Sequence, residues 1–392
     1  MPVHIQPSEL MKRLPAQFFS NLVAKTNRRI QEGHDVINLG QGNPDLPTPP
    51  HIIKALQQEG ENLRHHRYSP FTGYRELKEA IARWYFVHHQ VTLDPEKEVA
   101  VLPGSKTGLV EISQCLLNPG DQVLVPDPGY PDYWSGIAMA GARMVEMPLL
   151  AKNQFLPDYT KLSPEQRNGA KLMFLNYPNN PTGAIATPGF FRETIQFAEK
   201  NNIVIAHDFA YGPILYDGEP SLSFLSLPGA KETGIEFGSL SKMYNMAGWR
   251  VGYAVGNEKV IGLINTIQDH YYCSIFGAIQ MASVEALNGS QDCVKELTLT
   301  YQKRRDLLYA GLHDMGWNAP ISKGTFFCWL PVPHGFNSIS FSDFLLENAN
   351  VVVAPGTGFG PSGEGYVRLA LLTTEQRIQE FVERIKTLNI NF

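Results

Sequence analysis

The stretch NIVIAHDFAYG, residues 202–212, decides how the chain is organised. Its first half is apolar and β-branched, which predicts a short buried strand. That strand ends at Asp208, and the chain then enters a turn with aromatic residues and a glycine. Farther along, IEFGSL (235–240) has the same strand character and leads into SKMYNMAGWR. In both places a buried strand is expected to stop where polar, reactive residues begin.

The same pattern recurs on both sides of this stretch. The other expected strands are EVAVLP (98–103), QVLVP (122–126), KLMFLNY (171–177) and VGYAVG (251–256). Stretches of helical period lie between several of them, as at 109–117 and 188–201. Alternating strands and helices predict an α/β fold with a mostly parallel sheet that is covered on both faces. In such sheets the ligand site lies beyond the carboxyl ends of the strands.

Glycine and proline mark those carboxyl ends. The chain has 34 Gly and 28 Pro among 392 residues, and many of them lie in loops that follow a strand. These loops are GSKTG, DPGYPDYW, PNNPTG, FAYG and SKMYNMAGWR. Because parallel strands end at one edge of a sheet, we expect the loops to converge on a single site.

The carboxyl-terminal part of the chain predicts a second, smaller αβ unit. We expect a long exposed helix from about 286 to 315, which contains the run YQKRRDLL. Strands are expected at 326–332 and 366–372, and a final helix near 374–388. How the amino-terminal segment packs is not decided by its pattern.

Composition and charge exclude several classes of function. The 33 Lys and Arg residues face 38 Asp and Glu, a net charge of −5, so we expect neither nucleic-acid binding nor an anionic-membrane patch. No apolar run approaches the roughly 18 residues that a membrane span needs, and no secretory signal is evident. No histidine or cysteine spacing predicts a metal site. The cysteines, which lack a C-x-x-C pair, are expected to be reduced thiols of a cytoplasmic protein: Cys115, Cys273, Cys293 and Cys328.

Three features at the expected strand ends carry chemistry. Lys242 follows a buried strand, and burial lowers a lysine's pKa as a Schiff-base lysine requires, although a solvated loop lysine fits the same residues. Asp208 needs a cation, such as a protonated ring nitrogen, unless it caps a helix. GSKTG (104–108) precedes a helix, so its N–H groups can hold a phosphate, with Arg250 as a further cation.

Two other motifs are expected to be coincidental. Residues 239–242 match S-x-x-K and residues 106–108 match K-T-G, both found in penicillin-recognising serine enzymes. Here their order is reversed and S-D-N is absent. GTGFGPSG (356–363) resembles a nucleotide loop but lacks G-x-G-x-x-G spacing, so we expect an ordinary glycine-rich loop.

Taken together, these residues resemble the fold-type I pyridoxal 5′-phosphate enzymes, specifically the class I and II aminotransferases. The matching motifs are INLGQGNPDLPTP (37–49), NPTG (180–183), DFAYG (208–212), SLSK (239–242) followed by Arg250, and YVRLALL (366–372). The resemblance implies the α/β fold of aspartate aminotransferase, a ping-pong transfer of an amino group between an L-amino acid and a 2-oxo acid, and a homodimer with shared active sites. The expected parts are a segment that closes over the site and packs with the small domain (1–44), a large cofactor-binding domain (45–285) and a small domain (286–392).

The resemblance also implies a role for each matching residue. Lys242 would form the Schiff base and then act as acid and base, and Asp208 would pair with the pyridine nitrogen. Together with Tyr211 these are the expected catalytic residues. The other cofactor contacts would come from Tyr211 and Asn180 at the phenolic oxygen, Tyr130 stacked on the ring, Ser105, Lys106, Ser239, Ser241 and Arg250 at the phosphate, and Tyr68 at the neighbouring subunit's phosphate. Lysine is unusual at position 106, so the resemblance assigns the phosphate contact to the backbone of this residue and leaves the role of its side chain open. The substrate would bind to Gly42, Asn180 and Arg368, with Arg368 on the α-carboxylate.

The substrate is indicated less sharply. HDVINLGQGNPD, PDPGYPDYWSG, LMFLNYPNNPTGA and HDFAYG most resemble the bacterial methionine-salvage branch of the family, which implies formation of methionine from 4-methylthio-2-oxobutanoate. No second arginine is evident for a side-chain carboxylate. Residues expected on the crevice side would suit a thioether, although ordinary packing explains them equally well: Phe18, Phe19, Tyr130, Trp134, Met243 and Met246. The alternatives are an aspartate/alanine-type or LL-diaminopimelate aminotransferase, a β-lyase, and the aminotransferase-like domain of a transcription regulator.

Overall fold

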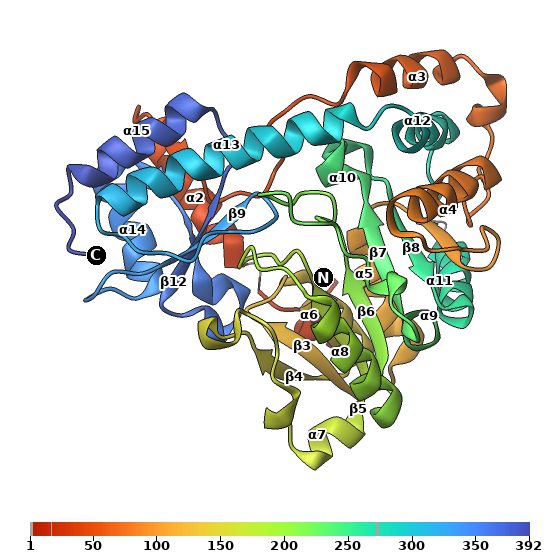
Figure 1. Cartoon of the computed structure of the whole chain (residues 1–392). Helices are drawn as coiled ribbons and strands as arrows, with labels where there is room; N and C mark the ends of the chain where they lie inside the picture. Colours follow the sequence, from red (N-terminus) through yellow and green to blue (C-terminus); the bar gives the residue numbers. More distant parts are fainter. Residues whose placement is uncertain (1–2, 17, 272–273) are drawn as a thin grey trace.

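A seven-stranded sheet forms the centre of the molecule (Figure 1). The structure is a computed structural model that describes residues 3–16, 18–271 and 274–392. The strand order is β2-β8-β7-β6-β5-β3-β4. The strands are β2 (Val99–Leu102), β3 (Gln122–Asp127), β4 (Arg143–Pro148), β5 (Ala170–Asn176), β6 (Val204–Asp208), β7 (Gly234–Ser239) and β8 (Gly252–Gly256).

All pairs in this sheet are parallel except those of β8, which runs antiparallel to both β2 and β7. As a result β2, β3, β5, β6 and β7 end at the same edge, which confirms the expected convergence of their loops. The strand β4 was not expected from the sequence. Its residues RMVEMP are mostly exposed at the edge of the sheet, so the apolar run that identifies a buried strand is missing.

Helices cover both faces of the sheet because strand residues alternate in direction. Val99 and Val101 face one apolar core, shared with α4, α8 and α12, while Ala100 and Leu102 face a second core, shared with α5, α6 and α11. The α-helices are α1 (Glu9–Arg13), α2 (Phe18–Gln31), α3 (Pro50–Gly60), α4 (Arg75–His89), α5 (Ser105–Leu116), α6 (Asp132–Ala140), α7 (Pro164–Gly169), α8 (Pro188–Asn201), α9 (Ala230–Thr233), α10 (Leu240–Met243), α11 (Glu258–Tyr271), α12 (Gly277–Asn288), α13 (Asp292–Asp314), α14 (Ser338–Ala349) and α15 (Glu375–Lys386). The single turns of 3₁₀-helix are η1 (Leu63–His66), η2 (Ala151–Asn153), η3 (Tyr159–Lys161), η4 (Phe224–Ser226), η5 (Ala247–Trp249), η6 (Gly356–Phe359) and η7 (Pro361–Gly363).

Two smaller sheets involve the carboxyl-terminal part of the chain. The first pairs β1 (Ile37–Asn38) with β10 (Val351–Val352) in parallel, so the amino-terminal segment joins the carboxyl-terminal region. The second has the order β11-β12-β9 and consists of β11 (Ala354–Pro355), β12 (Tyr366–Ala370) and β9 (Phe327–Pro331). The two expected strands of this region, β9 and β12, are therefore present. The domain boundaries at residues 45 and 286 stay predictions.

The long helix expected from 286 to 315 differs from the observed one in two respects. The chain forms two helices, because α12 ends at Asn288 and α13 begins at Asp292. In addition, α13 is not simply an exposed helix, since Arg304 and Arg305 are buried. Arg304 pairs with Asp45 at 2.9 Å and Arg305 pairs with Asp217 at 2.7 Å. These ion pairs allow the charged run to face the protein as α13 crosses the molecule (Figure 1).

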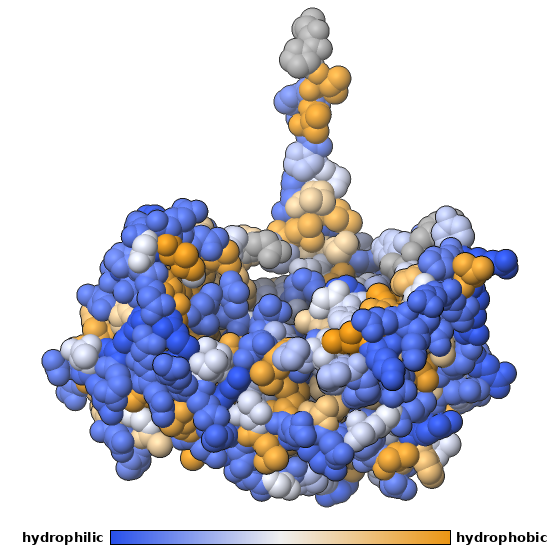
Figure 2. Space-filling view, turned by 90° about the horizontal axis from the view of Figure 1, so that it is seen from above, coloured by the Kyte–Doolittle hydropathy of each residue, from blue (hydrophilic) through white to orange (hydrophobic). Residues whose placement is uncertain are grey.

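A narrow arm stands out from the body of the molecule (Figure 2). Residues 3–8 are exposed, and among them Val3 and Ile5 present apolar side chains to solvent. Among the described residues, no helix has both the length and the apolar character needed to cross a membrane. Cys115, Cys293 and Cys328 are free thiols, whereas Cys273 lies outside the described residues.

Candidate active site

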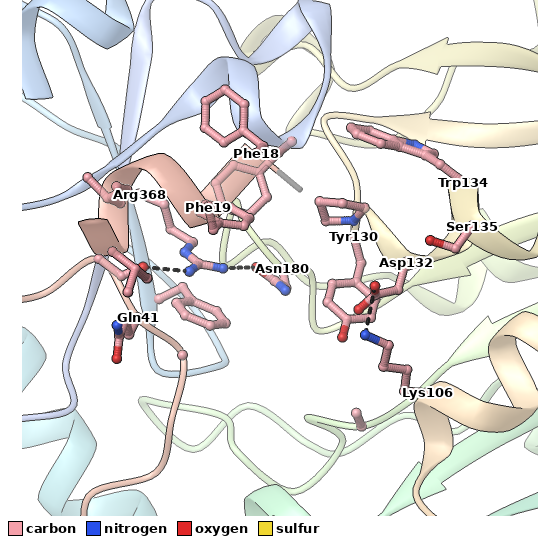
Figure 3. Close-up of a pocket in the computed structure, with 18 of the residues that line it drawn as sticks. Phe18, Phe19, Gln41, Lys106, Tyr130, Asp132, Trp134, Ser135, Asn180 and Arg368 are labelled. Carbon is pink, nitrogen blue, oxygen red and sulfur yellow. Dashed lines mark hydrogen bonds and ion pairs between the residues drawn. The ribbon is translucent and has the colours of Figure 1, made fainter. Parts of the chain in front are cut away.

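A cavity of about 430 Å³ opens at the edge where the parallel strands end. Most of the site residues expected from the sequence line it, and several are shown in Figure 3: Gly42, Ser105, Lys106, Tyr130, Asn180, Asp208, Tyr211, Lys242 and Arg368. Ser239, Ser241, Arg250 and Tyr68 do not line it. The loops after β2, β3, β5, β6 and β7 thus bring together side chains that are far apart in sequence.

Lys242 lies on α10, the short helix that follows β7. Its Nζ donates to the carbonyl oxygen of Gly42, in the amino-terminal segment, at 3.4 Å. Burial of the ammonium, and then the positive charge of Arg368, lower the pKa of Lys242 to about 8. A lysine in this state supplies a neutral amine close to neutral pH, which nucleophilic and proton-transfer chemistry both require.

Asp208, the last residue of β6, is 5% exposed. The Tyr133 hydroxyl donates to its Oδ2 at 2.9 Å, and the Ala210 N–H donates to its Oδ1 at 3.2 Å. Among the described residues no cation forms an ion pair with Asp208, and burial raises the pKa of its carboxyl. A buried carboxylate in this condition is stabilised by a positively charged ligand.

Two polar residues that sequence reasoning did not single out hold this region in place. The Asn176 side chain donates to the backbone oxygen of Asp208 at 2.8 Å and accepts from the N–H of Asn180 at 2.7 Å. It therefore fixes the relative positions of two cavity-lining residues. The other is Tyr133, the donor to Asp208. The only sequence signals were a polar residue ending an apolar strand and a tyrosine within DPGYPDYW.

Arg368 is buried in the wall opposite Lys106 (Figure 3). Its guanidinium donates to Oδ1 of Asn180 at 2.9 Å and to the carbonyl oxygen of Gly40 at 3.0 Å. Its Nε is buried and has no hydrogen-bond partner among the described residues, and burial lowers the pKa of Arg368 to about 10. Because no carboxylate neutralises this guanidinium within the described chain, it is available to bind an anionic group of a ligand.

The turn before α5 forms a compact cradle. A Cβ on Gly104, whose φ is +89°, would lie 2.2 Å from Nη2 of Arg250, and a Cβ on Gly252 would lie 2.4 Å from the backbone nitrogen of Ser105. Ser239 is the register partner of Gly252, so it lies in the same region. No side chain caps the first turn of α5. Free N–H groups at a helix start, beside an arginine and serines, suit a phosphate.

The backbone of Lys106 belongs to α5, whereas its side chain interacts with a residue of α6. Nζ of Lys106 lies 2.9 Å from Oδ1 of Asp132, the first residue of α6 (Figure 3). The lysine side chain is 54% exposed and that of Asp132 is 19% exposed. The ammonium thus pairs with a carboxylate at the cavity wall, while the backbone of residue 106 stays in the first turn of α5.

Several aromatic rings line the cavity together with aliphatic and polar residues. Phe18, Phe19 and Trp134 line it as expected, and Phe327 and Phe359 join them. The expectation for Met243 and Met246 was wrong, because both are buried in the core beneath the sheet edge and do not line the cavity. Successive helix residues point in different directions, so the turn that presents Lys242 to the cavity directs Met243 away from it.

The loop at 356–363, expected to be an ordinary glycine loop, contributes Phe359 to the wall. The Phe359 ring lies 4.5 Å from the guanidinium carbon of Arg368. Hydrogen bonds hold the loop to the end of β3: Gly129 N–H donates to the Phe359 carbonyl at 2.8 Å, and the hydroxyl and N–H of Ser362 donate to Asp127 at 2.7 and 3.1 Å. A Cβ on Gly360 would be 2.1 Å from Oδ1 of Asp127, so glycine is required there for this close approach.

Tyr68 lies apart from the cavity and is 96% exposed. Leu63 nearby in sequence is 80% exposed, and Phe276 is 43% exposed. Within the described chain, therefore, Tyr68 is not part of the cavity wall.

Comparison with known proteins gives a consistent result. The family model for aminotransferase class I and II matches residues 34–385. The chain is 55% identical to the L-glutamine–4-(methylsulfanyl)-2-oxobutanoate aminotransferase of Bacillus subtilis (strain 168), over 98% of this chain and 97% of that protein. It is 45% identical to an LL-diaminopimelate aminotransferase of Halothermothrix orenii, over 99% of this chain and 100% of that protein. The substrate-bound structure of BacF from Bacillus subtilis superposes with a TM-score of 0.95 at 48% identity, covering 100% of this chain and 99% of that one.

Proposed function

Because the chain belongs to the class I and II aminotransferases, which use pyridoxal 5′-phosphate, we propose that it transfers an amino group to 4-methylthio-2-oxobutanoate and so forms methionine. Glutamine is the proposed amino donor. The name of the Bacillus subtilis relative states this donor and this acceptor, and 55% identity over nearly the full length of both chains supports the same pair here.

The residues around the cavity fit the cofactor. Asp208 is buried and forms no ion pair with another described residue, as a partner for a protonated pyridine nitrogen should be. The cradle formed by Gly104, Ser105 and Arg250 offers backbone N–H groups and a guanidinium to a phosphate. Lys242 has a lowered pKa and lines the same cavity, within reach of an aldehyde placed between these two groups. When bound, the cofactor supplies an electron sink for the carbanion formed at the substrate's Cα.

Three side chains of this chain would act directly on the substrate. Arg368 would bind the α-carboxylate through its fixed guanidinium, whose orientation Asn180 maintains. The free amine of Lys242 would take the proton from the substrate's Cα and deliver it to C4′ of the cofactor. A pKa of about 8 is suitable for this proton transfer. The aromatic wall, including Phe18 and Phe359, would exclude water from the reacting atoms.

The observation that carries the choice of acceptor is the character of the cavity wall. The aromatic side chains that line the cavity include Phe18, Phe19 and Trp134. Its one additional cation, Lys106, already pairs with Asp132. An apolar thioether is compatible with this wall, and sulfur makes favourable contacts with aromatic rings. A second substrate carboxylate, which aspartate and LL-diaminopimelate reactions both require, would find no unpaired cation among the described lining residues other than Arg368 and Lys242, which serve the α-carboxylate and the amino transfer.

The test is a matrix of amino donors against 2-oxo acids. Glutamine, glutamate, aspartate, alanine and LL-diaminopimelate are each paired with 4-methylthio-2-oxobutanoate, oxaloacetate and pyruvate, and the amino acid formed is quantified. We expect the highest kcat/KM with glutamine and 4-methylthio-2-oxobutanoate. Fast reaction of oxaloacetate with an inert methylthio acceptor would contradict the proposal, and ammonia release without an acceptor would indicate elimination. Lys242→Ala should abolish turnover, whereas Lys259→Ala, at an exposed lysine on α11, should not.

We further propose that the enzyme is a cytoplasmic homodimer in which Tyr68 completes the partner's site. The exposure of Tyr68, Leu63 and Phe276 supports the presence of a partner, because such apolar surface is unusual in a monomer. The free thiols of Cys115 and Cys293 are in keeping with a reducing compartment.

Mixing two impaired variants tests the shared site. Tyr68→Ala chains retain Lys242, and Lys242→Ala chains retain Tyr68, so each hybrid dimer would contain one intact site. Unfolding and refolding the mixture should restore up to about a quarter of wild-type activity, because half of the dimers are hybrids and half of their sites are intact. If the mixture is no more active than its separate components, the shared-site arrangement is wrong.

A further inference from the structure

We propose that the ion pair between Lys106 and Asp132 determines which substrate side chains the site accepts. In this view Asp132 neutralises a cavity-lining ammonium, so that neutral side chains are preferred and a second carboxylate is rejected. The neutral side chains concerned are a thioether and a terminal carboxamide. The inference rests on the proposed aminotransferase reaction and specifies how its substrate class is chosen.

The position of the pair places it at the side-chain end of the cavity. Arg368 and Asn180 occupy one wall, and Lys106 and Asp132 occupy the wall opposite, beside Trp134 (Figure 3). A substrate whose carboxylate is bound by Arg368 therefore extends its side chain toward the ion pair and the aromatic ring. Lys106 lies in the first turn of α5 and Asp132 begins α6, so two packed helices fix both backbones.

Asp132 is held from two sides. Its Oδ1 accepts from Nζ of Lys106 at 2.9 Å, and on its other side it lies close enough to Tyr130 to act on the pKa of that hydroxyl. Burial, followed by the negative charge of Asp132, raises the pKa of Tyr130 well above its ordinary value, so that hydroxyl stays a donor. Because its side chain is mostly buried, the carboxylate is little screened by solvent. It is thus a fixed neutralising charge rather than a loosely associated counter-ion.

The charges that line the cavity are then all accounted for. Among the described lining residues the cations are Lys106, Lys242 and Arg368, and the anions are Asp132 and Asp208. With a substrate carboxylate on Arg368 and a cofactor nitrogen on Asp208, only the Lys106–Asp132 pair faces the side chain. A carboxamide can accept from the ammonium and donate to the carboxylate at once, whereas a carboxylate gains from one member and is repelled by the other.

The decisive variant is Asp132→Asn in the cofactor-loaded enzyme, which leaves the Lys106 charge without its counter-charge. We expect kcat/KM for 2-oxoglutarate, relative to 4-methylthio-2-oxobutanoate, to rise about tenfold or more, as an unpaired cation beside a substrate carboxylate should produce. The gain should disappear in the double variant Lys106→Gln/Asp132→Asn and should decrease with added salt.

Three results would overturn the inference. The ratio could stay unchanged while all activities and the melting temperature fall together, which would mean that Asp132 serves only to stabilise the start of α6. Asp132→Asn could tighten cofactor binding, measured by titration of apoenzyme, without altering the ratio, which would assign the pair to the phosphate. Wild-type enzyme could already prefer dicarboxylic acceptors, which would require a cation from elsewhere. A wild-type enzyme inert toward the methylthio acceptor would refute the proposed function alone, because the rise for 2-oxoglutarate can still be measured absolutely.

Discussion

Two buried carboxylates on neighbouring strands differ in how they are satisfied. Asp208 ends β6 and Glu236 lies within β7, and each is almost inaccessible to solvent. Glu236 accepts four hydrogen bonds of 2.8–2.9 Å, which come from Tyr85 Oη, Ser223 Oγ, the Phe224 N–H and His207 Nδ1. Asp208 accepts two side-chain or backbone hydrogen bonds, from Tyr133 and Ala210.

His207 shows how completely the Glu236 cluster is arranged. Its Nε2 accepts from the N–H of Tyr177 at 3.3 Å, so Nδ1 carries the proton that is donated to Glu236. Every lone pair of the glutamate has a fixed donor from the chain. Asp208, by contrast, has a raised pKa and lacks a cation among the described residues. Burial alone therefore does not mark a reactive carboxylate. A reactive carboxylate is one that is buried and whose negative charge the chain itself does not balance.

The sharpest test of this contrast is Asp208→Asn. We expect a loss of at least about 100-fold in kcat, because the cofactor nitrogen loses its counter-charge. At neutral pH the melting temperature of the cofactor-free protein should rise. The raised pKa of Asp208 means that its charged carboxyl opposes folding, and the variant removes that charge. As pH falls toward the ordinary value of 3.8, wild-type Asp208 takes up a proton and the advantage of the variant should shrink. A large loss of stability at pH 7 would make Asp208 a structural residue like Glu236.

A second test examines whether Lys242, like Asp208, is buried in surroundings that disfavour its charge. In the apoenzyme, its labelling by an amine-reactive reagent should be half-maximal near pH 8, the value to which burial lowers its pKa from 10.5. At pH 8 Lys242 should therefore react about 100 times faster than an equally accessible lysine of ordinary pKa, since each unit of pKa changes the neutral fraction tenfold. Peptide mass spectrometry measures both, with Lys259 as the reference. Equal rates for the two lysines would show that the cavity does not desolvate Lys242.

Glu236→Gln should give the reverse of Asp208→Asn. An amide offers one acceptor oxygen to four donors, so we expect a loss of about 2–4 kcal/mol in the free energy of unfolding. The folded, cofactor-loaded fraction should keep most of its kcat, since Glu236 does not line the cavity. Urea denaturation followed by assay of the folded enzyme measures the two effects. Glu61→Gln, at an exposed glutamate after α3, is the control and should change stability by less than about 0.5 kcal/mol.

The smallest effect is expected for Ser362→Ala, which tests a third buried carboxylate, Asp127. Burial raises the pKa of Asp127, and the hydroxyl and N–H of Ser362 are its donors. Removing the hydroxyl should cost about 1–2 kcal/mol of stability. It should also raise KM more than it lowers kcat, because the loop that carries Phe359 is less firmly held. An unchanged KM would indicate that the backbone bond between Gly129 and Phe359 positions the ring by itself.

The sequence predicted the fold and the reactive groups of the rim because their signals are local. An apolar run ending at Asp208 or before Lys242 specifies both a strand and the edge at which it stops. The helix at 188–201 was predicted with the bounds that α8 has. These features depend on periodicity and turn residues, which neighbouring residues determine.

The contacts that distinguish the two carboxylates are not local, and the sequence could not reveal them. Glu236 lies within IEFGSL, where it was read only as part of a buried strand, and its partner Tyr85 is 151 positions away. Phe359 lay in a loop expected to be unremarkable, and its place beside Arg368 depends on the contact between Asp127 and Ser362. Met243 and Met246 were placed on the wrong side because the directions of α10 and of the turn that follows it are set by packing and not by composition.

The alternation of β6 has a consequence for how this chain tolerates insertions and deletions. His207 and Asp208 are adjacent and point to opposite faces of the sheet, one into the Glu236 cluster and the other toward the cavity. Gaining or losing one residue in this five-residue strand would leave its hydrophobicity nearly intact but would turn each side chain to the opposite face. An insertion before His207 would bring that histidine to the place beside the cofactor, whereas a deletion would bring the Asp208 carboxylate to the place beside Glu236. The register of β6 thus determines which of these two side chains faces the site and which faces the buried Glu236 cluster.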